Sequence, residues 1–155
     1  MARYATYTPS GADVTGKVVA FLSGAPAKLP SNERAYYSSG AVKEAEAIRR
    51  GAIGTISFTS PDDPRFRWDV SVATSKQGGY AWVDAQGKPN RGDAALRGAA
   101  SLNHSGVQAL FAGAPTTPAD VFAAAAKSTP QAFTLATRVS LVTRSTHKDV
   151  ESANL

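Results

Sequence analysis

Residues 16–58 decide the fold: GKVVAFLSGAPAKLPSNERAYYSSGAVKEAEAIRRGAIGTISF. Their first part, residues 17–22, is an apolar run too short for a helix, which predicts a buried strand. A second apolar run at residues 52–58 predicts another strand. Residues 24–40 are expected to form a loop, and a helix is predicted over residues 41–50. Two strands joined through a helix form a βαβ unit and hence a parallel pair.

The sequence indicates which face of the predicted helix packs against the sheet and where the helix ends. Val42, Ala45 and Ile48 recur at three-residue spacing, so they are expected to face the sheet. Lys43 is expected on the solvent side of the same helix. Gly51 directly follows the last turn, where a residue with left-handed backbone ends many helices.

The loop after the first strand has no nucleotide-binding signature. It contains no G-x-G-x-x-G and no Gly-Lys-Ser/Thr ending. It is also too long for a glycine turn to deliver helix amides to a phosphate. The βαβ unit is therefore interpreted as structural.

The rest of the chain predicts further elements around this unit. Residues 59–79, with their prolines and a glycine pair, are expected to be a long loop. Capping signals predict two late helices: Asn103 or Ser105 caps one that Gly113 ends, and Thr117-Pro118-Ala119-Asp120 opens the other. The expected strands lie at residues 4–7, 80–83, 95–102 and 133–141, and the expected helices at 104–112 and 117–127. The predicted fold class is mixed α/β (α+β), in one domain spanning residues 1–155.

Composition disfavours several function classes. The net charge is +5, but the basic residues are scattered and form no basic helix, so nucleic acid is not the expected partner. No apolar run approaches the ~20 residues of a membrane span. Cysteine is absent, which excludes disulfides, thiolate metal sites and a thiol nucleophile.

No catalytic or metal-binding set is predicted. His147-Lys148-Asp149 has the H-x-D spacing of many zinc hydrolases, but no later residue completes a ligand shell, so a solvated tail is preferred. His104 is interpreted as the first residue of a helix. There is no G-x-S-x-G. Asp62-Asp63 lies between prolines and is interpreted as a turn.

Aromatic and arginine side chains in the two predicted loops form the candidate contact surface. Because both loops follow strands of one parallel pair, they are expected to be neighbours at one sheet edge. Such residues on a rigid scaffold are typical of contact surfaces. The alternative is that the aromatic residues fold back as lids on the core. The candidates are Arg34, Tyr36, Tyr37, Arg65, Phe66, Arg67 and Trp68.

Several short stretches together resemble one known family. In chain order they are Asp13-Val14-Thr15-Gly16-Lys17-Val18-Val19, Ser23-Gly24-Ala25-Pro26, Arg34-Ala35-Tyr36-Tyr37, Gly51-Ala52-Ile53-Gly54, Pro61-Asp62-Asp63, Trp82-Val83-Asp84, Ala109-Leu110-Phe111-Ala112-Gly113-Ala114-Pro115 and Ser152-Ala153-Asn154. In this combination the chain resembles the protease-associated domain of a bacterial zinc peptidase of metallopeptidase family 28, an aminopeptidase-like family. The resemblance covers nearly the whole chain.

The resemblance implies a fold and a role. The fold would be a swivelling β/β/α domain, a small open β-barrel or sandwich with a βαβ unit and flanking helices. The family's zinc ligands, which include an H-x-D and a Glu-Glu pair, would lie in a catalytic domain after residue 155. The chain itself has no adjacent glutamates. It is therefore expected to be a non-catalytic, mainly monomeric domain excised from a larger peptidase, with no cofactor of its own.

The implied partners are the catalytic domain of the same parent chain and a peptide or protein substrate. The domain would shape substrate access or mediate protein and peptide interaction. By the same resemblance, a secreted, periplasmic or cell-envelope location in a bacterium is expected. The alternatives are a free-standing protein- or ligand-binding module, an enzyme in its own right, and a nucleic-acid binder.

Overall fold

The protein is described by a computed structural model covering residues 12–64, 66–90, 96–142, 144 and 146–151. These residues form a mixed α/β fold with a three-stranded parallel sheet, in the order β1-β2-β3. The described elements are β1 (Val18–Leu22), α1 (Ser31–Ser38), α2 (Gly40–Arg49), β2 (Gly54–Phe58), α3 (Trp68–Ser75), β3 (Gly98–Leu102), α4 (His104–Leu110) and α5 (Pro118–Ala126).

The βαβ unit predicted from residues 16–58 is confirmed. β1 pairs with β2 in parallel, with Val18 opposite Gly54 and Leu22 opposite Phe58. The connection between them carries α2, which ends as predicted. Gly51 has φ +86°, and its N–H donates to the Ile48 carbonyl oxygen over 2.8 Å. The strand predicted at residues 95–102 is also present, as β3.

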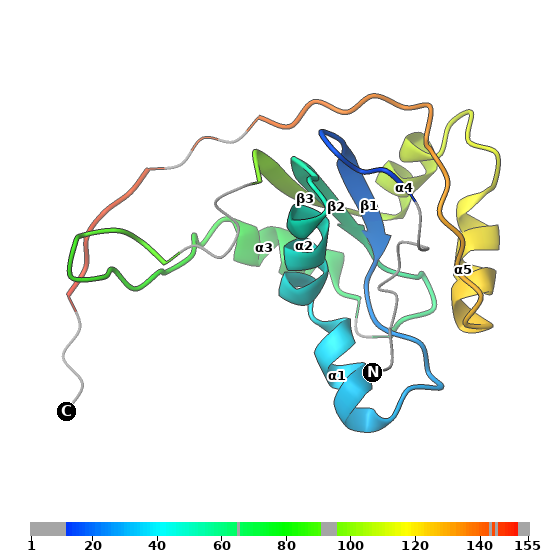
Figure 1. The fold of residues 1–155 in the computed structure, drawn as a ribbon, viewed down its shortest axis with the longest axis horizontal. Coiled ribbons are helices and arrows are strands. Elements are labelled where there is room, and N and C mark those ends of the chain that lie inside the picture. Colours follow the sequence, from blue (N-terminus) through cyan, green and yellow to red (C-terminus); the bar gives the residue numbers. More distant parts are fainter. Residues whose placement is uncertain (1–11, 65, 91–95, 143, 145, 152–155) are drawn as a thin grey trace.

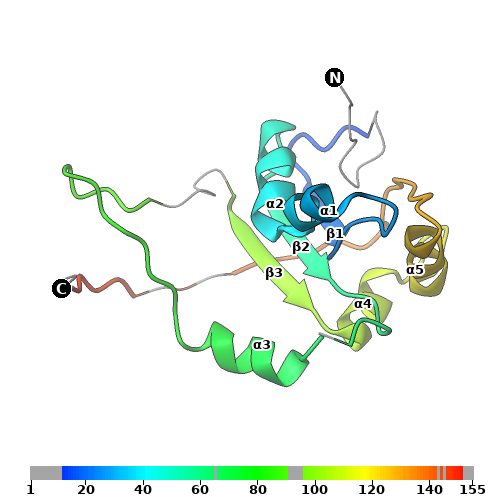
Figure 2. The same ribbon diagram turned by 90° about the horizontal axis from the view of Figure 1, so that it is seen from below.

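Helices cover the two faces of the sheet unequally (Figures 1 and 2). The larger core lies between the sheet and α4, with α5 and residues 133–135 packed against it; its buried members are Leu22, Ile56, Phe58, Val107, Leu110 and Phe111. On the other side α2 packs over β2 and reaches β1, where Val14, Val19, Ala47 and Ala52 form a smaller cluster. The exposed side chains of Ala99 and Ser101 show that this second face is left open over β3.

The face of α2 that meets the sheet differs from the prediction. Its buried residues are Lys43 and Ala47, whereas Ala45 is exposed. The expected stripe was therefore wrong at Ala45, while Val42 and Ile48 are half-buried; the solvent-facing position expected for Lys43 was also wrong. Positions four apart also share a helix face. A lysine can occupy such a face when its methylene stem packs on apolar groups and its amine finds acceptors.

The predicted caps of the last two helices are confirmed. The Asn103 side chain accepts a hydrogen bond from the Gly106 N–H over 2.9 Å at the start of α4. Thr117 and Asp120 form the capping box of α5, each side chain accepting from the backbone N–H of the other residue over 3.2 Å. After α4 the chain turns through Gly113, which has φ +72°.

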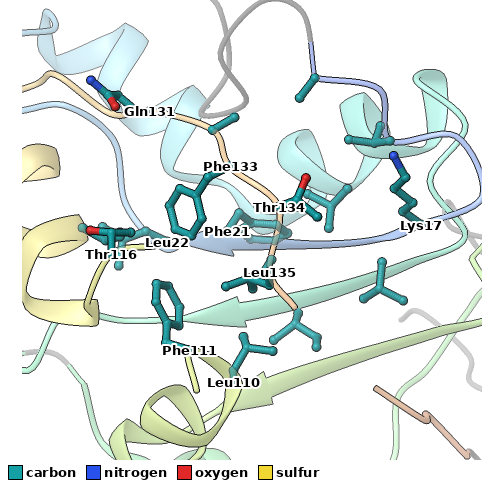
Figure 3. Close-up of a pocket in the computed structure, with 18 of the residues that line it drawn as sticks. Lys17, Phe21, Leu22, Leu110, Phe111, Thr116, Gln131, Phe133, Thr134 and Leu135 are labelled. Atoms are coloured by element: carbon teal, nitrogen blue, oxygen red, sulfur yellow. The ribbon is translucent and has the colours of Figure 1, made fainter. Parts of the chain in front are cut away.

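Four other expectations were wrong, and a fifth cannot be compared. Residues 24–40 and 59–79 are not continuous loops, because they contain α1 and α3. Residues 80–83 and 133–141 are not strands. Phe133 and Leu135 pack on the core while Thr134 is exposed (Figure 3). The alternation of apolar and polar residues therefore arises because one side of an extended segment faces the core, and not because the segment pairs with a strand. The strand expected at residues 4–7 lies outside the described residues.

Between α3 and β3 the chain forms an arm, residues 76–90, that extends away from the sheet (Figures 1 and 2). An isolated antiparallel bridge joins Val83 to Pro89. The Asp84 carboxylate accepts from the Gln86 and Lys88 N–H groups over 3.0 and 2.8 Å, which shapes the turn between them. Tyr80 is 91% exposed and Trp82 64% exposed, so the arm displays aromatic side chains to solvent.

Candidate functional site

The carboxyl edge of the sheet gathers most of the predicted contact residues. Because the three strands are parallel, Leu22, Phe58 and Leu102 all end at this edge. The chain then continues into the loop before α1, the loop before α3 and the start of α4, respectively. Binding residues of open α/β sheets commonly lie beyond this edge.

The Lys43 amine closes the end of β1. Its Nζ donates to the Leu22 carbonyl oxygen over 2.7 Å and also to the Gly24 carbonyl oxygen. It lies 5.6 Å from the centre of the Phe21 ring. Lys43 is only 6% exposed, and burial lowers the pKa of its amine from 10.5 to about 8. The Lys43 side chain, which belongs to α2, therefore anchors the segment of chain that leaves the end of β1.

The two predicted tyrosines lie on α1. Their rings meet edge to face, with 5.1 Å between the ring centres of Tyr36 and Tyr37. Tyr36 is 61% exposed. Arg34 on the same helix is exposed, and its Nη1 donates over 3.5 Å to the Ala27 carbonyl oxygen in the preceding loop. An exposed aromatic side chain and a guanidinium group thus share one short helix.

The second set of predicted residues surrounds the start of α3. Phe66 and Trp68 are half-buried, with ring centres 6.2 Å apart. Phe66 also lies against His104, the first residue of α4, at 5.1 Å between ring centres. Arg67 is exposed and makes a two-point ion pair with Asp69, with Nη2 2.8 Å from Oδ2. Arg65 lies outside the described residues.

The structure therefore forms two aromatic groups at this edge instead of one. Tyr36 contacts Tyr37, and Phe66 contacts both Trp68 and His104. Among the described residues, no ring contact joins the two groups. Sequence reasoning missed the part played by His104, although its position directly after a strand at the same edge is a usable signal. It also missed Lys43.

The described residues hold no group of three or more His, Asp or Glu side chains placed to bind a metal ion. His147 and Asp149 lie in the exposed segment after α5. Several ion pairs join neighbours along the chain: the Glu46 carboxylate, for example, lies 2.6 Å from both Arg49 and Arg50. Across the part of the chain that is described, no helix has the length and apolar composition to span a bilayer.

These features define a class: an open α/β protein whose short parallel sheet carries two separate aromatic groups at its carboxyl edge. Comparison with known proteins adds no closer identity. No family model, no curated protein and no solved structure matches the chain.

Proposed function

We propose that this chain is a non-catalytic protease-associated domain of a zinc-dependent, aminopeptidase-like peptidase. In that role it shapes substrate access or engages a peptide or protein substrate. The proposal starts from the sequence resemblance, and the parallel βαβ unit is compatible with it. The swivelling β/β/α barrel or sandwich of the family belongs to this proposal. So does a secreted or cell-envelope location.

The observation that carries the binding role is the pair of aromatic groups at the carboxyl edge. Tyr36 is exposed on α1, and Trp68 is half-exposed at the start of α3. Arg34 and Arg67 lie beside them with exposed guanidinium groups. Tyr, Trp and Arg are the residues that most often dominate binding energy at protein interfaces.

In this proposal, peptide cleavage is carried out by the catalytic domain of the parent enzyme. The zinc ion of the parent enzyme belongs to that separate catalytic domain, as the sequence resemblance implies. No catalytic step is therefore derived from the residues of this chain. Its contribution would be positioning of polypeptide, through Tyr36, Trp68 and their neighbours.

The peptidase connection is tested first by the coding sequence that follows residue 155. A zinc-peptidase domain there would support the proposal. An unrelated continuation would remove the peptidase part and leave the alternative, a free-standing module that binds protein or ligand.

The surface itself is tested in the parent enzyme with Trp68→Ala and Tyr36→Ala. We expect reduced kcat/KM on long peptides, little change on single-aminoacyl substrates, and nearly unchanged thermal stability. Trp82→Ala is the matched control, because it removes an exposed Trp from the arm. Equal kinetics in all variants would reject the surface. A large loss of stability in Trp68→Ala would instead make this ring a lid on the core.

A further inference from the structure

The outer edge of β1 carries backbone groups with no partner in the described part of the chain. The Lys17 carbonyl oxygen accepts from the Ile53 N–H over 3.0 Å, and the Ser23 N–H donates to the Phe58 carbonyl oxygen over 2.7 Å. Odd-numbered residues therefore direct their backbone groups toward β2. The N–H and C=O groups of Val18 and Ala20 point the opposite way, because these groups alternate in direction along a strand.

A groove of about 1080 Å³ lies beside this edge. One wall comes from α5, through Val121 and Ala125, and another from the extended segment that carries Phe133 and Leu135 (Figure 3). Val18 and Ala20 themselves line it. The groove therefore combines unpaired backbone donors and acceptors with apolar walls.

We propose that this groove binds an extended polypeptide segment, which adds to the sheet as a further strand beside β1. Only another extended backbone offers alternating N–H and C=O groups at the spacing of Val18 and Ala20. Apolar side chains at every second position of the segment would enter the groove. Strand addition of this kind takes affinity from the backbone and selectivity from the side-chain pockets. This surface is distinct from the aromatic groups at the carboxyl edge.

The shape of the groove favours a single segment over a second copy of the chain. Both α5 and the segment carrying Phe133 pack on the face of the sheet that presents Val18, Ala20 and Leu22, and both line the groove beside β1. A second copy would bring the same two walls to the seam between the two β1 edges, where they would compete for the space beside the strands. A lone extended strand brings only its own side chains to the groove.

Charge indicates one further property of the segment. Arg138 lines the groove, and no carboxylate in the described residues pairs with it. Among the described residues that line the groove, Asp13 and Asp120 are acidic; Asp13 lies 3.6 Å from Lys17, and Asp120 is held in the cap of α5. An acidic side chain on the bound segment would therefore complement Arg138.

The test measures binding of the fluorescein-labelled peptide acetyl-Glu-Val-Thr-Val-Thr-Val-amide to the full 155-residue chain. We expect saturable binding and slower amide exchange at Val18 and Ala20. The variant Ala20→Pro removes an outward N–H without breaking a bond to β2, a position where a strand tolerates proline. It should weaken binding about tenfold, as expected for the loss of one or two backbone hydrogen bonds.

Matched controls separate strand addition from nonspecific adsorption. The peptide is made in two forms, N-methylated at its Val residues or at its Thr residues, and only one form should lose binding because alternate amides face β1. Arg138→Glu should weaken binding and recover when Lys replaces the peptide's Glu. Lys88→Glu, with the same charge change on the arm, should have no effect. If Ala20→Pro does not fold, the affinities of the two N-methylated peptides and of Arg138→Glu decide whether the peptide adds to β1.

Several results would overturn the proposal. These are the absence of saturable binding, equal affinity for both N-methylated forms, and unchanged affinity in folded Ala20→Pro. Dimerisation of the chain without peptide binding would assign the groove to a second copy. Binding that occurs only after residues 1–11 are removed would assign it to those residues.

Discussion

The buried amine of Lys43 should make the stability of the protein rise at alkaline pH. Its pKa is about 8 in the folded protein and 10.5 without burial. Below pH 8 the amine is charged in both states, so folding carries the full cost of burying the charge. Between about pH 8 and 10.5 the unfolded chain binds more protons than the folded one, and the free energy of unfolding increases with pH.

The size of this rise follows from the two pKa values. At about 1.4 kcal/mol for each pH unit between them, the upper limit is about 3.4 kcal/mol. The bonds from Nζ to the Leu22 and Gly24 carbonyl oxygens favour the charged amine and reduce the effect. We therefore expect a gain of about 2–3 kcal/mol relative to a variant without the amine.

Urea unfolding of the parent protein and of Lys43→Met at pH 7 to 10.5 measures this difference directly. Subtracting the two curves removes the titration of all other groups. Lys28→Met, which removes an exposed amine, is the matched control and should follow the parent protein at every pH. A parent-minus-Lys43→Met difference that stays flat from pH 7 to 10.5 would refute the reasoning.

Two further predictions concern helix ends. Gly51→Val should lower the free energy of unfolding by about 1–3 kcal/mol, because φ is +86° and a new Cβ would lie 3.3 Å from the Thr15 side chain; an unchanged denaturant midpoint would contradict it. Thr117→Ala should lower stability by about 1 kcal/mol through loss of the cap on α5. Thr117→Ser restores the hydroxyl, and its thermal melt should lie close to that of the parent.

Local chemistry explains why the helix ends could be predicted. Gly51 needs a left-handed backbone, and Asn103 and Thr117 offer side-chain acceptors to the first free N–H groups of α4 and α5. Each signal acts within a few residues, so the surrounding tertiary structure does not need to be known. The parallel pairing of β1 and β2 followed from their apolar runs and the helix between them.

The missed helices lack the pattern that makes a helix visible in sequence. Neither α1 nor α3 buries any residue, so neither shows an apolar stripe. Lys43 was misplaced for a different reason. A lysine is expected at the surface, and its inward position depends on carbonyl groups supplied by β1 and the loop after it.

The candidate site was predictable only in part. The parallel sheet directs the connections after β1 and β2, which carry Tyr37 on α1 and Phe66 before α3, to one edge, as the sequence predicted. Which rings then touch depends on packing between distant segments. Phe66 meets His104, which is supplied by α4, and no sequence pattern links those two positions. The groove beside β1 likewise requires α5 and residues 131–139 to be placed in space.

The arm at residues 76–90 divides the chain into two parts that can associate without a covalent link between them. The piece before it carries β1, α2 and β2, and the piece after it carries β3, α4 and α5. They share the β2–β3 ladder and the contacts of Phe58 with Phe111 and Phe122. A protease that cuts the exposed arm would thus leave a nicked but assembled protein. The same position suits a split-protein reporter, in which separately expressed halves recombine.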